Sequence, residues 1–233
     1  MRRELFSVAV LLAVVLASGC TSTERQAPAV QRPIGPVLGA LTALNSATDY
    51  LDSVYAGSVI IVPFTLTRKL QGTPCAWDGE GAGNATRWMM VFEAIVASGG
   101  FGRHVTVAVT VEYRGGKVGV KHAPVQSTEV NGSDADRVMD EIDNLSLASN
   151  ISFDSHYMFL KADPQKWALS ADLYYLQSIT MTLYDASTSP HGSAVPTWEI
   201  EWKYIARDSY RPAVSTVVLD AADGALIKVV PPP

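Results

Sequence analysis

The sequence predicts an α+β protein in which antiparallel sheets are each packed by a helix. Residues 104–113 and 197–205 alternate apolar and polar side chains with the period of two that indicates a half-buried strand. Residues 37–55 instead repeat apolar or small side chains in steps of three and four, which is the period of one helix face. Short glycine-containing turns separate the strands and favour hairpins, hence antiparallel pairing.

The composition is that of an ordered, weakly acidic protein. The chain has 233 residues, of which 48% are hydrophobic and 18% are charged, and its formal net charge is −5. This apolar content supports a packed core, and the length allows one large domain or two small ones. The negative charge argues against nucleic acid as a partner, because such surfaces neutralise phosphates with basic residues.

The first half is expected to be a helix followed by four strands. Pro63 favours an edge or a bulge in the first of these strands. The glycine-rich stretch at 71–86 is interpreted as a loop, since it lacks the spaced oxygen ligands of a calcium loop. Gly115 and Gly116 form a hairpin turn. The expected strands of this half are 58–67, 88–96, 104–113 and 118–122.

The second half is expected to follow a polar connector at 124–132. Ser133 is interpreted as the cap of a helix whose acidic face is solvated. Residues 152–160 are ambiguous, with a strand slightly favoured over a helix. Asp163-Pro164 predicts a helix that runs to about residue 177. The expected strands of this half are 178–185, 197–205, 214–219 and 225–230.

The strand at 197–205 is expected to have one buried and one exposed face. The inward residues are Trp198, Ile200, Trp202 and Tyr204, and the outward residues are Glu199, Glu201 and Lys203. A one-residue slip would bury three charges, so the register should be fixed. We expect replacement of the outward Glu199 by alanine to change stability by no more than about 0.5 kcal/mol.

The two halves carry corresponding landmarks. Trp88 and Trp198 begin corresponding strands, and Gly116 and Gly224 lie in corresponding turns. This order fits a structural repeat, and it also fits an ordinary antiparallel α+β domain.

Residues 163–230 resemble the PepSY family. The resemblance rests on the strand that begins with Trp198 and on the turn from Asp220 to Gly224, whose sequence is Asp-Ala-Ala-Asp-Gly. The first half has Glu-Tyr-Arg-Gly-Gly in place of that turn. The resemblance implies PepSY/cystatin-like units, two in tandem if the halves are repeats. PepSY modules occur in secreted protease propeptides and surface lipoproteins, so the resemblance implies a module that binds or restrains peptides or peptidases and has no catalytic residues.

The first twenty residues predict export and a lipid anchor. A basic start precedes an apolar run at 5–17 that is too short for a bilayer span and ends in Ala-Ser-Gly-Cys20. This end resembles a prokaryotic lipobox, although Ala17 stands where the pattern usually has leucine. The resemblance implies a signal peptide at 1–19 and a lipidated Cys20. Residues 20–36 then form a flexible tether, followed by α+β units at 37–123 and 133–230.

Four of the five asparagines lie in Asn-X-Ser/Thr sequons. These glycosylation candidates are Asn84, Asn131, Asn144 and Asn150. Sequons matter only in an exported chain, and together with a lipobox they resemble archaeal cell-surface lipoproteins. We therefore expect the sequons on the protein surface, and an extracellular, lipid-anchored location on the outer face of the cytoplasmic membrane.

No catalytic motif, metal site or cofactor is predicted. The four histidines, His104, His122, His156 and His191, lack ligand spacing with one another or with cysteine. Cys75 is interpreted as a small buried hydrophobe. The first hypothesis is a non-catalytic binding module, whose partners are the membrane, through the lipid, and a protein or peptide. The second is a glycosylated structural envelope component, and the third is a hydrolase whose site is assembled from scattered residues.

The lipid anchor gives the first testable prediction. Cys20→Ser removes the thiol that would carry the lipid, so the variant should leave the membrane fraction or remain unprocessed. Cell fractionation and electrophoretic mobility measure both outcomes. A variant that fractionates and migrates like the wild type would show that the anchor is absent.

Overall fold

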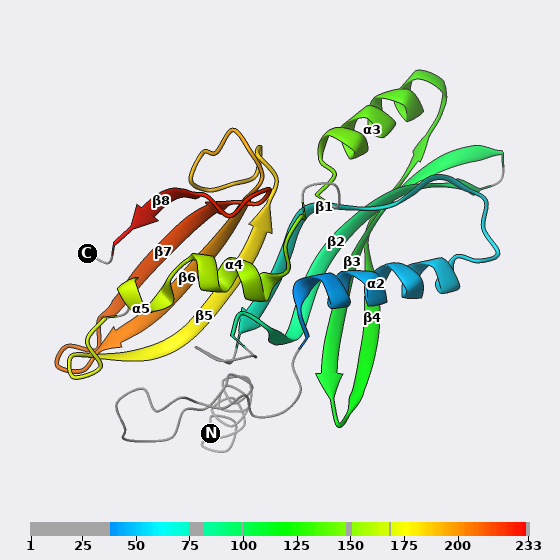
Figure 1. Cartoon of the computed structure of the whole chain (residues 1–233). Helices are drawn as coiled ribbons and strands as arrows, with labels where there is room; N and C mark the ends of the chain where they lie inside the picture. The colour runs from blue at the N-terminus through cyan, green and yellow to red at the C-terminus, as the bar shows by residue number, and fades with distance from the viewer. Residues whose placement is uncertain (1–37, 75–81, 99, 148–150, 168, 232–233) are drawn as a thin grey trace, which may run out of the picture.

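The computed structural model describes residues 38–74, 82–98, 100–147, 151–167 and 169–231. Its α+β fold is dominated by one antiparallel sheet, with the strand order β4-β3-β2-β1-β5-β6-β7-β8 (Figure 1). The strands are β1 Ile60–Pro74, β2 Ala85–Ser98, β3 Phe101–Arg114, β4 Lys117–Val130, β5 Tyr174–Tyr184, β6 Thr197–Ala206, β7 Pro212–Asp220 and β8 Leu226–Val230.

The two faces of the sheet are covered by different helices (Figure 1). The helices are α2 Ala40–Val54, α3 Gly132–Asn144, α4 Ser155–Lys161 and α5 Pro164–Trp167. In β2, Ala94 belongs to the main core with α2 and α4, whereas its neighbour Ile95 packs in a second cluster with Val138 and Ile142 of α3. Successive residues of a strand point to opposite faces, so α3 lies on the face opposite α2. We call these the α2 face and the α3 face.

Each half of the sheet is a four-stranded meander preceded by a helix. α2 precedes β1 to β4, and α4 and α5 precede β5 to β8. The meanders join where residues 69–72 of β1 pair with residues 181–184 of β5. The expectation of separate sheets is therefore wrong. Pairing of the first strand of one meander with the first strand of the other leaves the joined sheet with fewer open edges.

Two tryptophans and a glycine fill the junction between the halves. Trp88 of β2 and Trp198 of β6 are fully buried, and their ring centroids lie 6.5 Å apart in an edge-to-face arrangement. A Cβ on Gly72 would lie 2.5 Å from Cε3 of Trp88, so this ring occupies the space of the missing side chain. Trp88 Nε1 also donates to the Leu38 carbonyl at 2.8 Å.

The first turns of α2 and α4 meet at Asp154. Its Oδ1 accepts from the Ser155 amide at 2.7 Å and from the Leu41 amide at 3.1 Å. Ser155 Oγ accepts from the Ala40 amide at 3.1 Å. One carboxylate and one hydroxyl therefore bond amides at the starts of both helices, where helical amides have no partner within the helix.

The predicted register of the strand at 197–205 is confirmed. β6 pairs with β7, which pairs with β8, and the four predicted inward residues are each 3% exposed or less. The Trp202 ring lies 6.2 Å from that of Phe159 in α4, so this face is the helix-covered one. In the turn after β7, Asp220 Oδ1 accepts from the Ala222 amide at 2.8 Å, and Gly224 has a φ of 75° that favours glycine.

Two predictions between residues 152 and 177 are wrong. Residues 152–160, for which a strand was slightly favoured, contain the helix α4, whose N-cap is Asp154. The helix expected at 163–177 ends at Trp167, and β5 begins at Tyr174. Asp163 has a φ of 49°, which interrupts the helical path between α4 and α5. Pairing of β5 with both β1 and β6 overrides the local helix signal.

The prediction of a polar connector at 124–132 is also wrong. β4 continues through it to Val130, and it is the outer strand of the sheet with most of its side chains exposed. Such a strand needs no apolar alternation, which explains its polar sequence. The expected loop at 71–86 likewise begins as strand, because β1 runs to Pro74. α3, assigned from sequence to the unit at 133–230, contacts β1, β2 and β3 of the first half.

Among the described residues, no helix is long and apolar enough to cross a membrane. The predicted signal peptide, Cys20, the tether and Cys75 lie outside these residues.

The close approach of Gly72 to Trp88 gives the second prediction. Gly72→Ala forces the buried ring to move, and such overpacking costs about 1–3 kcal/mol of unfolding free energy. Denaturant melts measure this cost. The matched control is Gly57→Ala, because a Cβ on Gly57 meets no atom within 4 Å; it should change stability by no more than about 1 kcal/mol. Equal costs for the two variants would contradict the packing described for the junction.

Candidate functional site

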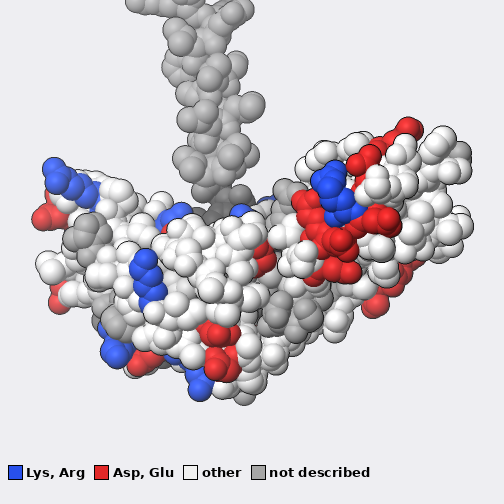
Figure 2. Space-filling view, turned by 90° about the horizontal axis from the view of Figure 1, so that it is seen from above, with Lys and Arg blue, Asp and Glu red and all other residues white. Residues whose placement is uncertain are grey.

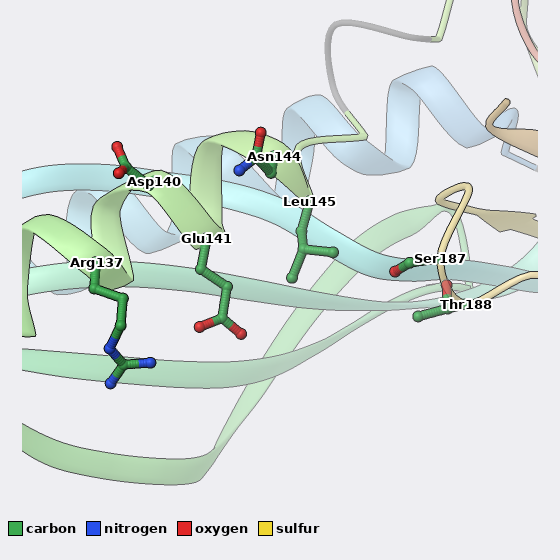
Figure 3. Close-up of a pocket in the computed structure, with 7 residues that line it drawn as sticks. All are labelled: Arg137, Asp140, Glu141, Asn144, Leu145, Ser187 and Thr188. Carbon is green, nitrogen blue, oxygen red and sulfur yellow. The ribbon is translucent and has the colours of Figure 1, made fainter. Parts of the chain in front are cut away.

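A cleft of about 500 Å³ lies between the C-terminal half of α3 and the loop that joins β5 to β6 (Figure 3). It is lined by Arg137, Asp140, Glu141, Asn144, Leu145, Ser187 and Thr188. Its size falls in the range of sites that hold small molecules or short peptide segments. Its lining combines carboxylates, an amide, hydroxyls and a guanidinium with apolar atoms, which make up most of the exposed lining surface.

The α3 wall of the cleft carries two carboxylates, Asp140 and Glu141, and one guanidinium, Arg137. Arg137, Glu141 and Leu145 are spaced by one helical turn each and project to the same side in Figure 3, while Asp140 and Asn144 project to another side. Figure 2 shows this end of the molecule as a concentration of acidic side chains around a basic one. The acidic residues of α3 are Asp134, Asp136, Asp140, Glu141 and Asp143.

The opposite wall is a turn held by Asp185, the first residue after β5. Asp185 Oδ1 accepts from the Ser187 amide at 2.6 Å and from the Thr188 amide at 3.1 Å, and both hydroxyls also donate to its carboxylate. Burial alone would raise the pKa of Asp185, but these four hydrogen bonds together lower it below its usual value. The turn therefore depends on an ionised carboxylate.

The same loop is tied to β6 through Glu199. Ser189 Oγ donates to Glu199 Oε1 at 2.8 Å, and His191 Nε2 lies 3.6 Å from Glu199 Oε2. The expectation that Glu199 is exposed is wrong, because it is only 6% exposed: it lies on the α3 face of β6, where these loop residues contact its carboxylate. Burial, with a smaller contribution from Glu201, raises the pKa of Glu199 despite the opposing contacts.

A serine, a histidine and a glutamate therefore meet at this loop, but their connectivity is not that of a catalytic triad. In a triad the serine hydroxyl bonds the imidazole, and the carboxylate bonds the other side of that imidazole. Here Ser189 Oγ donates to Glu199, and it is the His191 backbone amide that donates to Ser189 Oγ at 3.4 Å. Within the described part of the chain, no three histidine, cysteine or acidic side chains are placed to hold a metal ion.

The predicted glycosylation sites differ in their surroundings. Asn131 and Asn144 are exposed at the two ends of α3, and Asn144 also lines the cleft. Asn84 is partly buried beside α4, where its Oδ1 accepts from Ser155 Oγ at 3.5 Å. Asn150, like Cys20, lies outside the described residues.

The residues on which the resemblance to the PepSY family rests lie away from the cleft. Trp198 lies in the core at the junction, and Asp220 and Gly224 form the turn between β7 and β8. Sequence reasoning missed the cleft, although one part of it had a readable signal: Asp-X-Ser-Thr directly after a strand is typical of an aspartate-capped turn.

Comparison of the chain with models of protein families, with curated proteins and with solved structures finds no match.

The raised pKa of Glu199 gives the third prediction. The folded protein binds this proton more tightly than the unfolded chain, so the carboxyl contributes most stability below its ordinary pKa and loses it as pH rises through the raised pKa. Glu199→Gln cannot titrate. Its unfolding free energy relative to wild type should therefore be higher at pH 7 than at pH 4, as measured by denaturant melts at both pH values.

The control for this pH series is Glu129→Gln, which alters an exposed carboxylate on β4. Its stability difference from wild type should be nearly the same at both pH values. A Glu199→Gln difference that falls as pH rises would contradict the assigned environment of Glu199.

Proposed function

We propose that this chain is a non-catalytic, membrane-anchored binding module of the cell surface whose cleft takes a basic peptide segment. The proposal joins the anchor predicted at Cys20 to the chemistry of the cleft. We also propose that the two helix-and-meander halves are tandem PepSY/cystatin-like units. The module would then bind or restrain peptides or peptidases.

The observation that carries the proposal is the pairing of an acidic helix with a hydroxyl-bearing turn across one cleft. Glu141 and Asp140 both line the cleft, although they project to different sides of α3, and Ser187 and Thr188 line its other wall. Carboxylates favour lysine and arginine side chains, with which they form charge-assisted hydrogen bonds. Arg137 lines the same cleft and suits a carbonyl or carboxylate of the bound chain. A peptide that carries basic side chains presents all of these groups.

The charge of the whole molecule supports the same class of ligand. The formal net charge of −5 favours encounter with cationic partners. α3 adds to this locally, because its 13 residues include five acidic side chains and one arginine.

A glycosylated structural envelope lipoprotein is the second candidate. It is favoured by the positions of Asn131 and Asn144, which are exposed at both ends of α3. Glycans at these positions would cover the acidic helix, and one of them would stand at the cleft.

The fourth prediction tests the binding of basic peptides. Calorimetric titration of the purified protein with penta-lysine should give saturable binding that weakens with added salt, because the contact is electrostatic. Glu141→Gln should weaken binding about three- to tenfold, since one charge-assisted contact is lost. Penta-glutamate should not bind.

The matched control is Asp208→Asn, which removes the same charge from the exposed hairpin between β6 and β7. It should leave the penta-lysine affinity within about twofold of wild type, because exposed charges beyond a Debye length are screened. Equal losses in the two variants would mean that penta-lysine responds to net charge and not to the cleft. No binding by the wild type would overturn the proposed ligand class.

A further inference from the structure

The hydroxyl wall of the cleft is connected to the sheet by a buried carboxylate that does not line the cleft. Ser187 and Thr188 line the cleft, and the next residue, Ser189, donates its hydroxyl to Glu199 Oε1 at 2.8 Å. Two residues further on, His191 Nε2 lies 3.6 Å from the other carboxylate oxygen. Both oxygens of Glu199 therefore contact the loop directly behind the cleft wall.

Asp185 and Glu199 have different effects on this wall. Asp185 bonds Ser187 and Thr188 within the turn, so it sets the shape of the turn. Glu199 belongs to β6, and its bond to Ser189 joins the end of that turn to the neighbouring strand. The shape of the wall and its place over the sheet thus depend on two different carboxylates.

The burial of Glu199 costs free energy because it disfavours the ionised carboxylate, and a residue with a merely structural role would not need that group. Glu199 is 6% exposed. Glu201 on the same strand face disfavours the ionised form of Glu199, whereas His191 and Lys228 favour that form. On the adjacent strand, the pKa of Tyr184 is raised by burial and, to a smaller extent, by the charge of Glu199. A buried carboxylate costs free energy unless its hydrogen bonds compensate, and the hydrogen bond to Glu199 Oε1 comes from Ser189 of the cleft loop.

We propose that Glu199 is the positioning residue of the cleft: it holds the turn that carries Ser187 and Thr188 at the distance from α3 that a bound peptide requires. The position of the turn follows from the contacts above, and the effect on a peptide rests on the proposed function. Glu199 acts through Ser189 and does not touch the ligand.

The test compares Glu199→Ala with Glu199→Gln in the full chain. Alanine removes the acceptor for Ser189, whereas glutamine keeps a carbonyl acceptor and removes only the charge. Hydrogen exchange is followed at the amides of Thr188, Ser189 and Gly192, which are bonded within the loop, and penta-lysine affinity is measured on the same samples. The control, Val109→Ala, deletes core methyl groups on the α2 face.

Glu199→Ala should speed exchange at the three loop amides and weaken penta-lysine binding, each about tenfold, since Ser189 loses its acceptor on β6. Glu199→Gln should stay within about threefold of wild type in both measurements. Val109→Ala should lower global stability without a selective change at the loop or in affinity.

Two outcomes would overturn the positioning role. Loop exchange in Glu199→Ala equal to wild type would show that Glu199 does not hold the turn, whatever happens to binding. A loss of affinity in Glu199→Gln as large as in alanine, with normal loop exchange, would show that Glu199 acts by its charge. If wild-type protein does not bind penta-lysine, the proposed function fails, and the exchange measurement still decides whether Glu199 holds the turn.

Discussion

The pairing of residues 69–72 of β1 with residues 181–184 of β5 joins two meanders into one sheet. The contact is short, and side chains on the α2 face reinforce it. Trp88 and Trp198 meet there edge to face, and Gly72 leaves room for the first ring. Asp154 and Ser155 add a second connection, because they bond amides at the starts of α2 and α4. Aromatic packing and shared helix caps thus make one body of two halves.

The same junction creates the cleft on the α3 face. After α3, Leu147 N donates to the Leu66 carbonyl at 2.9 Å, so the end of that helix is attached to β1. A few residues along β1, Lys69 pairs with Tyr184, the last residue of β5. The β5–β6 loop must therefore begin beside the end of α3. A weaker junction would separate these two walls, which links the packing of the core to the proposed binding of basic peptides.

Sequence patterns predicted the parts of the fold that local alternation determines. β6 was placed correctly because a slip would bury three charges, and the Asp220 turn because aspartate bonds its own backbone. The sequence did not predict α4, because Asp154 and Ser155 at its start accept hydrogen bonds from amides of α2, which is far away in the sequence. The cleft joins residues 137–145 to residues 187–188, and no local pattern predicts that contact. Glu199 lies on the face that alternation marks as polar, and the β5–β6 loop brings Ser189 and His191 against its carboxylate.

The most direct test of the joined halves is a double-mutant cycle on Trp88→Leu and Trp198→Leu, with unfolding free energies from denaturant melts. Leucine keeps an apolar side chain at each position but removes the ring, and with it the edge-to-face contact between the halves. We expect a coupling energy of about 0.5–1.5 kcal/mol, the range measured for aromatic pairs. Strict additivity, within about 0.3 kcal/mol, would show that the two tryptophans stabilise their own halves independently, and would contradict the claim that their contact joins the sheet.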